Sequence, residues 1–239
     1  MPRPTSYFVC GTPRTGSTYL CDLLASTGVA GHPESYFREP DQQNWARRFG
    51  VRVSSDGSFD YSAFVQGAVQ AGTSPNGVFA ARIMWGTLDL LVRGLRKSIT
   101  VNDLDVLGEV FGPIHFVHLH RTDVIGQAVS WGRAEQTGYW QRGDAAEVEP
   151  HLDVGQVDDL VRTVRDHNSA WSAWFVEQGA QPQEVVYEDL IYDPRGTVLG
   201  VLECQGLVAP SDWRPQSEHV RQADVVNEEW VRRYSQGRV

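Results

Sequence analysis

Short apolar runs alternate along the chain with longer segments in which apolar residues recur every three or four positions. Four of the runs have the length and the β-branched and aromatic content of buried strands. They lie at the start of 6–18 and over 78–84, 114–120 and 184–187. Because segments of helical periodicity follow these runs, the pattern predicts strands and helices in alternation.

The helices are predicted from apolar positions that share one face of a 3.6-residue period. After the first run, Leu20, Leu23 and Leu24 form such a face, and Gly28 is suited to end the helix in a left-handed conformation. Further helices are expected near 45–49, over 61–72 behind an Asp60 cap, over 88–95, after 123 and through 131, over 154–178 and 197–204, and over 228–234 behind an Asn227 cap, with a turn over 189–194.

Alternating strands and helices are typical of an α/β domain with a mainly parallel central sheet flanked by helices. The chain has 239 residues, which is enough for one sizeable core and short for two domains. No internal repeat, low-complexity run or interdomain linker interrupts the pattern. We therefore expect a single domain over 1–239.

A glycine-containing loop follows the first strand. Gly11 and Gly16 have the spacing of the nucleotide-binding P-loop, G-x-x-x-x-G-K-S/T, in which backbone N–H groups and a helix N-terminus bind phosphate. Ser17 occupies the position of the P-loop lysine, and the nearest fixed positive charge is Arg14. The loop predicts a P-loop-like fold that binds a phosphate without the chemistry of nucleoside triphosphates.

Further arginines could bind an anion. Arg121 follows the third strand, at the edge where open α/β sheets bind ligands, and Ser130 comes nine residues later on the next helix. Together these two side chains could hold a second phosphate from two sides. Arg82 stands inside the apolar second strand, where a charge needs a partner or a ligand. Arg221, in the polar tail, is a weaker third element.

Composition restricts the kind of partner. A formal net charge of −9 argues against nucleic acids and acidic membranes, so an anionic ligand has to be met by a few local arginines. No long uncharged apolar run and no signal peptide is evident, and the three cysteines form no C-x-x-C pair. We expect a cytoplasmic protein without a membrane span. The histidines of 114–120 have no second set of ligands with known spacing nearby, so no metal is expected.

Several segments occur in a characteristic order along the chain. They are Gly11-Thr12-Pro13-Arg14-Thr15-Gly16-Ser17-Thr18, 27–31, 75–78, Met84-Trp85, His120-Arg121-Thr122-Asp123-Val124 with 127–131, and Arg221-Gln222-Ala223-Asp224 with 229–234. In combination they resemble one family, the sulfotransferases related to mycobacterial trehalose 2-sulfotransferase. The resemblance covers nearly the whole chain, and the order of the motifs makes it more specific than any one of them.

The resemblance implies an enzyme that binds 3′-phosphoadenosine-5′-phosphosulfate (PAPS) and transfers its sulfuryl group to a carbohydrate hydroxyl, as a homodimer. It assigns the 5′-phosphosulfate to the first loop, at Arg14, Thr15, Gly16, Ser17 and Thr18. By the same resemblance Arg121 and Ser130 bind the 3′-phosphate, and Arg221 lies in a tail loop that closes over it. Tyr187 is assigned to the adenine because Tyr187-Glu188-Asp189-Leu190 is similar to a tetrapeptide of the wider group.

The absence of the P-loop lysine agrees with this donor. A sulfuryl group carries less negative charge than a terminal phosphoryl group, so its transfer needs less of the Mg²⁺ clamp that kinases use. Transfer is expected to be an in-line displacement. Donors from the loop, together with Arg82, would stabilise charge on the bridging and sulfuryl oxygens.

The acceptor hydroxyl needs a general base. The related trehalose enzymes carry a glutamate in a Gly-x-Pro-x-Glu-Phe-Phe segment, and the segment here is Gly31-His32-Pro33-Glu34-Ser35-Tyr36-Phe37. Ser35 occupies the matching position, and the carboxylate is displaced by one residue. We expect Glu34 to be the base, with His32 as the second candidate, and both His32 and Ser35 to lie beside the acceptor.

The acceptor itself is left open between trehalose, another glycoside and the sugar of a specialised metabolite. Residues 32–76 and 133–155 are expected to shape its pocket, with Arg47 and Arg48 on a solvated helix face. Trp85 and Trp131 either line the pocket or pack in the core. Two other functions compete: a P-loop nucleotide kinase, which the missing lysine disfavours, and a non-catalytic nucleotide-binding module that has lost the base.

Overall fold

The computed structural model describes residues 6–96, 102–138, 140, 149–217 and 225–237. A four-stranded sheet lies at its centre, in the order β2-β1-β3-β4, and every neighbouring pair is parallel. The strands are β1 (Ser6–Gly11), β2 (Phe79–Met84), β3 (Ile114–His120) and β4 (Gln183–Val186). The predicted α/β class with a mainly parallel sheet is confirmed.

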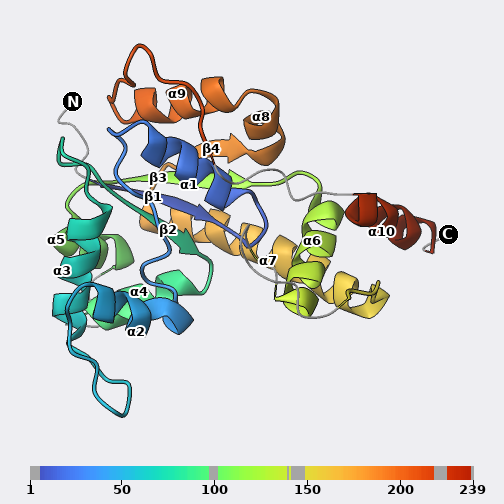
Figure 1. Ribbon diagram of the computed structural model, residues 1–239, viewed down its shortest axis with the longest axis horizontal. Coiled ribbons are helices and arrows are strands. Elements are labelled where there is room, and N and C mark those ends of the chain that lie inside the picture. The colour runs from blue at the N-terminus through green and yellow to red at the C-terminus, as the bar shows by residue number, and fades with distance from the viewer. Residues whose placement is uncertain (1–5, 97–101, 139, 141–148, 218–224, 238–239) are drawn as a thin grey trace.

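Helices cover both faces of the sheet (Figure 1). They are α1 (Ser17–Ser26), α2 (Glu39–Arg48), α3 (Tyr61–Gly72), α4 (Thr87–Leu95), α5 (Asp103–Phe111), α6 (Val124–Thr137), α7 (Val154–Gln178), α8 (Tyr187–Tyr192), α9 (Pro194–Cys204) and α10 (Val225–Gln236). One face carries α1, α8 and α9, and the other carries α3, α4 and α5 together with α7.

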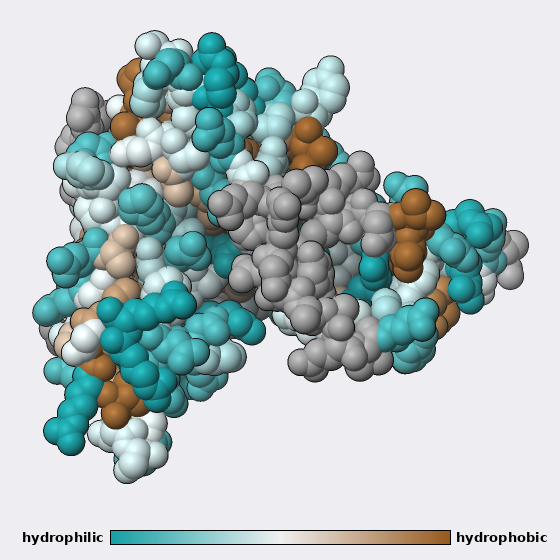
Figure 2. All heavy atoms as spheres, in the orientation of Figure 1, coloured by the Kyte–Doolittle hydropathy of each residue, from teal (hydrophilic) through white to brown (hydrophobic). Residues whose placement is uncertain are grey.

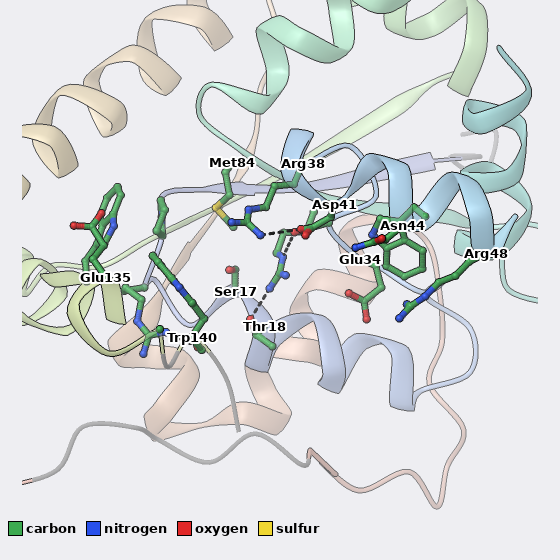
Figure 3. Close-up of a pocket in the computed structure, with 17 residues that line it drawn as sticks. Ser17, Thr18, Glu34, Arg38, Asp41, Asn44, Arg48, Met84, Glu135 and Trp140 are labelled. Carbon is green, nitrogen blue, oxygen red and sulfur yellow. Dashed lines mark hydrogen bonds and ion pairs between the residues drawn. The ribbon is translucent and has the colours of Figure 1, made fainter. Parts of the chain in front are cut away.

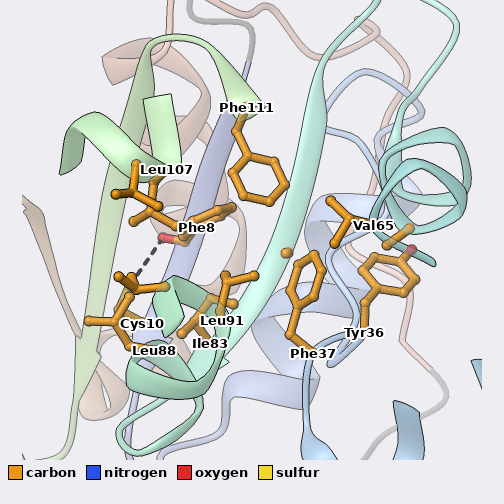
Figure 4. Close-up of a cluster of buried hydrophobic side chains, with 14 of the residues drawn as sticks. Phe8, Cys10, Tyr36, Phe37, Val65, Ile83, Leu88, Leu91, Leu107 and Phe111 are labelled. Carbon is orange, nitrogen blue, oxygen red and sulfur yellow. Dashed lines mark hydrogen bonds between the residues drawn. The ribbon is translucent and has the colours of Figure 1, made fainter. Parts of the chain in front are cut away.

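Strand β1 divides the core into two layers because successive side chains of a strand point to opposite faces. Tyr7 and Val9 pack with leucines of α1 and with α9, whereas Phe8 and Cys10 face α4, α5 and α7. Figure 4 shows the second layer, in which Phe8 and Phe111 meet edge to face with ring centroids 5.2 Å apart. All six residues of β1 are buried, so the loop that follows β1 starts from a rigid position.

A third apolar cluster lies beside the sheet, between α6, α7 and α10. Its most buried members include Val129 of α6, Val164 of α7 and Tyr234 of α10. This packing fixes α6, the helix that carries Ser130, relative to the end of β3.

Most element bounds lie close to those that the sequence pattern predicts. Strand β3 and helix α7 have the predicted bounds 114–120 and 154–178, and Asp60 caps α3 by accepting a hydrogen bond from the Ala63 amide at 3.0 Å. Helix α5 was not predicted, although Asn102 caps it by accepting from the Asp105 amide at 2.8 Å and Val106, Leu107 and Phe111 are buried along one side.

Two expectations near the end of the chain are wrong. Strand β4 ends at Val186, and Tyr187 begins the short helix α8 where a turn was expected. Asn227 lies inside α10 rather than at its cap, and its Oδ1 accepts a hydrogen bond from Arg133 of α6 at 2.7 Å. A local sequence pattern does not contain this long-range contact.

The described surface shown in Figure 2 is mainly polar, with small separate apolar areas. Among the helices in the described ranges, none combines the length and the apolar character needed to cross a membrane.

Candidate active site

The loop between β1 and α1 has the backbone of an anion-binding site. Gly16 takes a left-handed conformation at the N-cap of α1, with φ of 80°, and Arg14 does the same at φ 68°. No side chain caps α1 within the described part of the chain, and its first turn holds no acidic residue. The N–H groups of this turn and the positive end of the helix dipole therefore remain for an anion.

Neighbouring elements hold the loop in place. The Thr15 hydroxyl donates to the Thr12 carbonyl at 3.0 Å, and the buried amide of Gln127, on α6, donates to the Pro13 carbonyl at 2.7 Å. A Cβ on Gly11 would approach the Leu119 carbonyl oxygen of β3 to 2.8 Å, so this position needs glycine. Thr15 thus turns its hydroxyl toward the loop itself.

Arg14 links the loop to α6. Its Nε donates a hydrogen bond to Ser130 Oγ at 3.0 Å, and its Nη1 donates to the Trp140 carbonyl at 2.6 Å. The structure therefore brings together two residues that the sequence analysis assigned to different phosphates of one donor. A guanidinium and a hydroxyl in contact could be shared by one anion.

Arg82, the charged residue inside the apolar strand β2, has hydrogen-bond partners at the edge of the pocket. Its Nε donates to Ser35 Oγ at 2.7 Å, and its Nη1 donates to Thr18 Oγ1 at the start of α1. These contacts satisfy the guanidinium with neutral oxygens, so its positive charge is not compensated by a carboxylate at either contact. Such a charge beside an uncapped helix N-terminus favours an anionic ligand.

Glu34 is held by the backbone of β2. The segment forms a parallel bridge between Glu34 and Ala81, and the Arg82 amide donates to the Glu34 carbonyl at 3.0 Å. The segment thus runs alongside the edge of the sheet, and its main chain is fixed next to the arginine. The Glu34 side chain is exposed, so its carboxylate is accessible to a bound molecule.

A pocket of about 700 Å³ opens in front of these groups (Figure 3). Its walls come from the loop and α1, from the Glu34 segment, from β2, from α2 and from α6 with the residues after it. The lining residues are Pro13, Arg14, Ser17, Thr18, Glu34, Ser35, Arg38, Asp41, Asn44, Trp45, Arg48, Arg82, Met84, Trp131, Glu135, Gly138 and Trp140.

His32, the second candidate base, does not line this pocket. Its side chain is exposed, while its backbone N–H donates to the Gly72 carbonyl at 2.9 Å and its carbonyl accepts from the Tyr36 hydroxyl at 2.8 Å. The geometry therefore favours Glu34 over His32.

A second group of predicted residues adjoins the loop at Gly16. The Tyr187 ring lies so close that a Cβ on Gly16 would come within 2.5 Å of Tyr187 Cδ2. The Arg121 guanidinium lies over the same ring, 4.7 Å from its centroid, and donates to Asp123 Oδ2 at 3.0 Å. Arg121 thus contacts Tyr187 and Asp123, whereas Ser130 contacts Arg14. Arg221 lies outside the described residues.

Glu188 holds the turn that carries Arg121. Its two carboxylate oxygens accept the backbone N–H groups of Thr122 and Asp123, each at 3.1 Å. Burial raises the pKa of Glu188, but these two N–H groups, its own backbone N–H and the Thr122 side chain together lower it by more, so the pKa lies below its usual value. The carboxylate is ionised at neutral pH and fixes the turn after β3.

Helix α2 forms one wall of the pocket and lies within 32–76, the range that the sequence analysis expected to shape it. Asp41, Asn44, Trp45 and Arg48 line the pocket, and Figure 3 shows Arg48 extending from α2 near Glu34. The Arg48 guanidinium lies 4.8 Å from the Trp45 ring centroid, and the side chain is exposed, as expected for a solvated helix face. In the sequence, these pocket-lining residues stand at helical spacing directly after the Glu34 segment.

Trp85 and Trp131, which the sequence analysis left open between the pocket and the core, have different positions. Trp131, which is 9% exposed, lines the pocket from α6. Trp85 packs edge to face against Trp171 with ring centroids 5.1 Å apart, and its backbone N–H donates to the Gly11 carbonyl. Trp85 therefore belongs to the scaffold under the loop.

Comparisons with known proteins agree on one family. The family model described as Stf0 sulphotransferase matches residues 6–237. Trehalose 2-sulfotransferase of Mycolicibacterium smegmatis is 32% identical over 97% of this chain and 94% of its own, and that of Mycobacterium tuberculosis is 33% identical over 95% and 93%. A solved sulfotransferase domain from the curacin biosynthetic pathway superimposes with a TM-score of 0.56 at 14% identity, covering 95% of this chain and 82% of that one, which supports the fold.

Proposed function

Because the chain belongs to the Stf0 sulfotransferase family and is a sulfotransferase, we propose that it transfers the sulfuryl group of PAPS to a hydroxyl of a carbohydrate or glycosylated small molecule. The observation that carries the proposal is the convergence of Ser17, Thr18, Arg82 and Glu34 on one pocket. That convergence combines an anion-binding helix terminus, a cation and an accessible carboxylate.

The donor would bind along the loop. The uncapped turn of α1 and the side chains of Arg14, Ser17 and Thr18 would hold the 5′-phosphosulfate. Arg121 and Ser130 would bind the 3′-phosphate, and Tyr187 would contact the adenine. Tyr187, which lies against Gly16 under the Arg121 guanidinium, supports the assignments of Tyr187 and Arg121. Ser130 contacts Arg14 rather than Arg121, so its assignment to the 3′-phosphate rests on the family resemblance.

The reaction would be an in-line displacement at sulfur. The acceptor oxygen forms a bond to sulfur while the bond from sulfur to the bridging oxygen of the 5′-phosphate breaks, and the acceptor proton passes to Glu34. Negative charge grows on the departing phosphate, next to Arg82 and the N-terminus of α1. Preorganised donors at that point stabilise the transition state. No metal clamp is needed for this charge.

The wall of α2 and the tryptophans of α6 and its continuation would receive the acceptor. Trp45, Trp131 and Trp140 offer aromatic surface, and Asp41 and Asn44 offer hydrogen-bonding groups to sugar hydroxyls. Trehalose is the first acceptor to test, since two relatives carry it in their names, and other glycosides come next. We also propose a homodimer, on the resemblance alone.

Incubating the protein with PAPS and a panel of sugars and glycosides, with mass detection of an added sulfate, tests the proposal. A sulfated product and stoichiometric adenosine 3′,5′-bisphosphate (PAP) are expected without added Mg²⁺. The family does not favour the kinase alternative, and ATP with Mg²⁺ in place of PAPS is the matching control. Donor binding with no transfer to any acceptor would instead favour a non-catalytic nucleotide-binding module.

A further inference from the structure

Two histidines and a carboxylate meet at the β3–β4 edge of the sheet, away from the pocket. His118 and His120 stand two positions apart on β3, so both side chains point to the same face. Glu184 of β4 is the register partner of His118. None of the three lines the pocket. The sequence analysis expected no metal because a second ligand set was missing, and parallel pairing of β3 with β4 supplies one.

The three side chains direct ligand atoms at one point. Nδ1 of His118 lies 3.2 Å from Oε1 and 3.0 Å from Oε2 of Glu184, and Nδ1 of His120 lies 3.2 Å from the same Oε2. One nitrogen or oxygen atom from each residue falls within 4.8 Å of the others. Zinc bonds of about 2.0–2.2 Å in tetrahedral geometry place neighbouring ligand atoms about 3.3 Å apart. The two observed separations between a histidine nitrogen and Glu184 Oε2, 3.0 and 3.2 Å, are close to that value.

Hydrogen bonding alone leaves part of the cluster unexplained. Nδ1 of His120 is a buried atom that makes no hydrogen bond within the described residues, although it faces the carboxylate at 3.2 Å. The His118 side chain is only 5% exposed and packs against Phe175, with ring centroids 5.5 Å apart. Two imidazole nitrogens that face one carboxylate, one of them without a well-formed hydrogen bond, leave a position that a cation would fill.

We propose that His118, His120 and Glu184 bind a divalent transition-metal ion and thereby join the edge strand β4 to β3. Two imidazoles and one carboxylate suit zinc, whereas magnesium and calcium prefer oxygen ligands alone. Glu184 is 52% exposed, so water can reach the ion and complete its coordination. The ion would also brace the end of β3 that precedes Arg121. This proposal is independent of the proposed sulfuryl transfer.

Binding of Co²⁺ and Zn²⁺ to protein without a histidine tag, after treatment with a chelator, tests the site. Visible absorption of bound Co²⁺ and its displacement by Zn²⁺ should report one ion per chain. His120→Gln and Glu184→Gln should each weaken binding at least tenfold, because each removes one of three ligands. Zinc at a hundredfold excess over the wild-type Kd should raise the Tm of the wild type by roughly 5 °C, and the same zinc concentration should raise the Tm of each variant by no more than about half as much.

His115→Gln is the matched control. His115 is an exposed histidine of the same strand on the opposite face, so its loss should leave metal affinity and the Tm shift unaltered. His118 is not substituted, because it is buried and its loss could prevent folding. Wild-type binding no tighter than that of Glu184→Gln, or an equal loss in His115→Gln, would overturn the proposal in favour of adventitious surface binding.

Discussion

At the scale of single residues, the ability of the site to bind an anion depends on the hydrogen-bond partners of its arginines. Arg82 stands in a strand whose neighbours are buried, and neutral oxygens of Ser35 and Thr18 satisfy it instead of a carboxylate. A guanidinium held by these two hydrogen bonds keeps its positive charge available to a ligand in the pocket. Its position beside the first turn of α1 is where a departing phosphate would gain charge.

Arg82→Met should lower kcat for sulfuryl transfer by roughly a hundred- to a thousandfold, the range for removal of one preorganised transition-state donor. Steady-state kinetics with PAPS measures the loss. Arg82→Lys keeps the charge but cannot make both hydrogen bonds, so its kcat should lie between those of the wild type and Arg82→Met. Near-normal turnover of Arg82→Met would remove this residue from the mechanism.

A side chain on Gly16 would strain the left-handed backbone and also clash with the Tyr187 ring. Substitution of Gly28 measures the backbone strain without such a clash. Gly28 has φ of 70° and no neighbouring atom within 4 Å of the point that a Cβ would occupy, so Gly28→Ala should cost only the backbone strain, about 1–2 kcal/mol. Gly16→Ala should destabilise the protein further and weaken PAP binding. Urea unfolding and PAP titration of both variants make the comparison, and equal losses for the two would show that the Tyr187 contact has no role.

At the scale of elements, the strand edges and helix N-termini position the site. The loop joins β1 to α1, Arg82 lies on β2, and Arg14 reaches Ser130 on α6. The strands and the loop could be predicted because buried parallel strands are continuous apolar runs and the loop has a fixed glycine spacing. Helix α2 was predicted as a short helix within the range expected to shape the acceptor pocket, but the residues of α2 that line the pocket were not predicted, since only the fold shows which face of the helix meets it.

Arg48→Met should raise the KM for the acceptor roughly tenfold and leave the KM for PAPS within about twofold, because a hydrogen bond to a charged group contributes about 1.5–3 kcal/mol. Arg47→Met is the control, since Arg47 is exposed on the same helix and does not line the pocket. Initial rates at varied acceptor concentration and saturating PAPS give the KM for the acceptor. Initial rates at varied PAPS concentration and saturating acceptor give the KM for PAPS. A rise confined to the KM for PAPS would place α2 on the donor side instead.

At the scale of the whole molecule, an acidic protein forms a locally basic pocket. The formal net charge is −9, yet Arg14, Arg38, Arg48 and Arg82 line the pocket against Glu34, Asp41 and Glu135. The need for a few local arginines followed from the composition. The meeting of these arginines with Glu34 did not follow from it. The Glu34 segment reaches Arg82 through an isolated bridge to β2 and the hydrogen bond from Arg82 to Ser35, and contacts between distant segments leave no periodic signal in the sequence.

The central claim is that Glu34 accepts the proton of the acceptor hydroxyl in a sulfuryl transfer from PAPS. Glu135→Gln is the control, because Glu135 is a second carboxylate on the pocket wall whose Oε2 accepts a hydrogen bond from Gln156 at 3.1 Å.

The most direct measurement compares the turnover and the PAP affinity of the wild type, Glu34→Gln and Glu135→Gln. Glu34→Gln should lose roughly a hundred- to ten-thousandfold in kcat while its Kd for PAP stays within about twofold, and Glu135→Gln should keep most of its turnover. Turnover of Glu34→Gln close to that of the wild type would contradict the account.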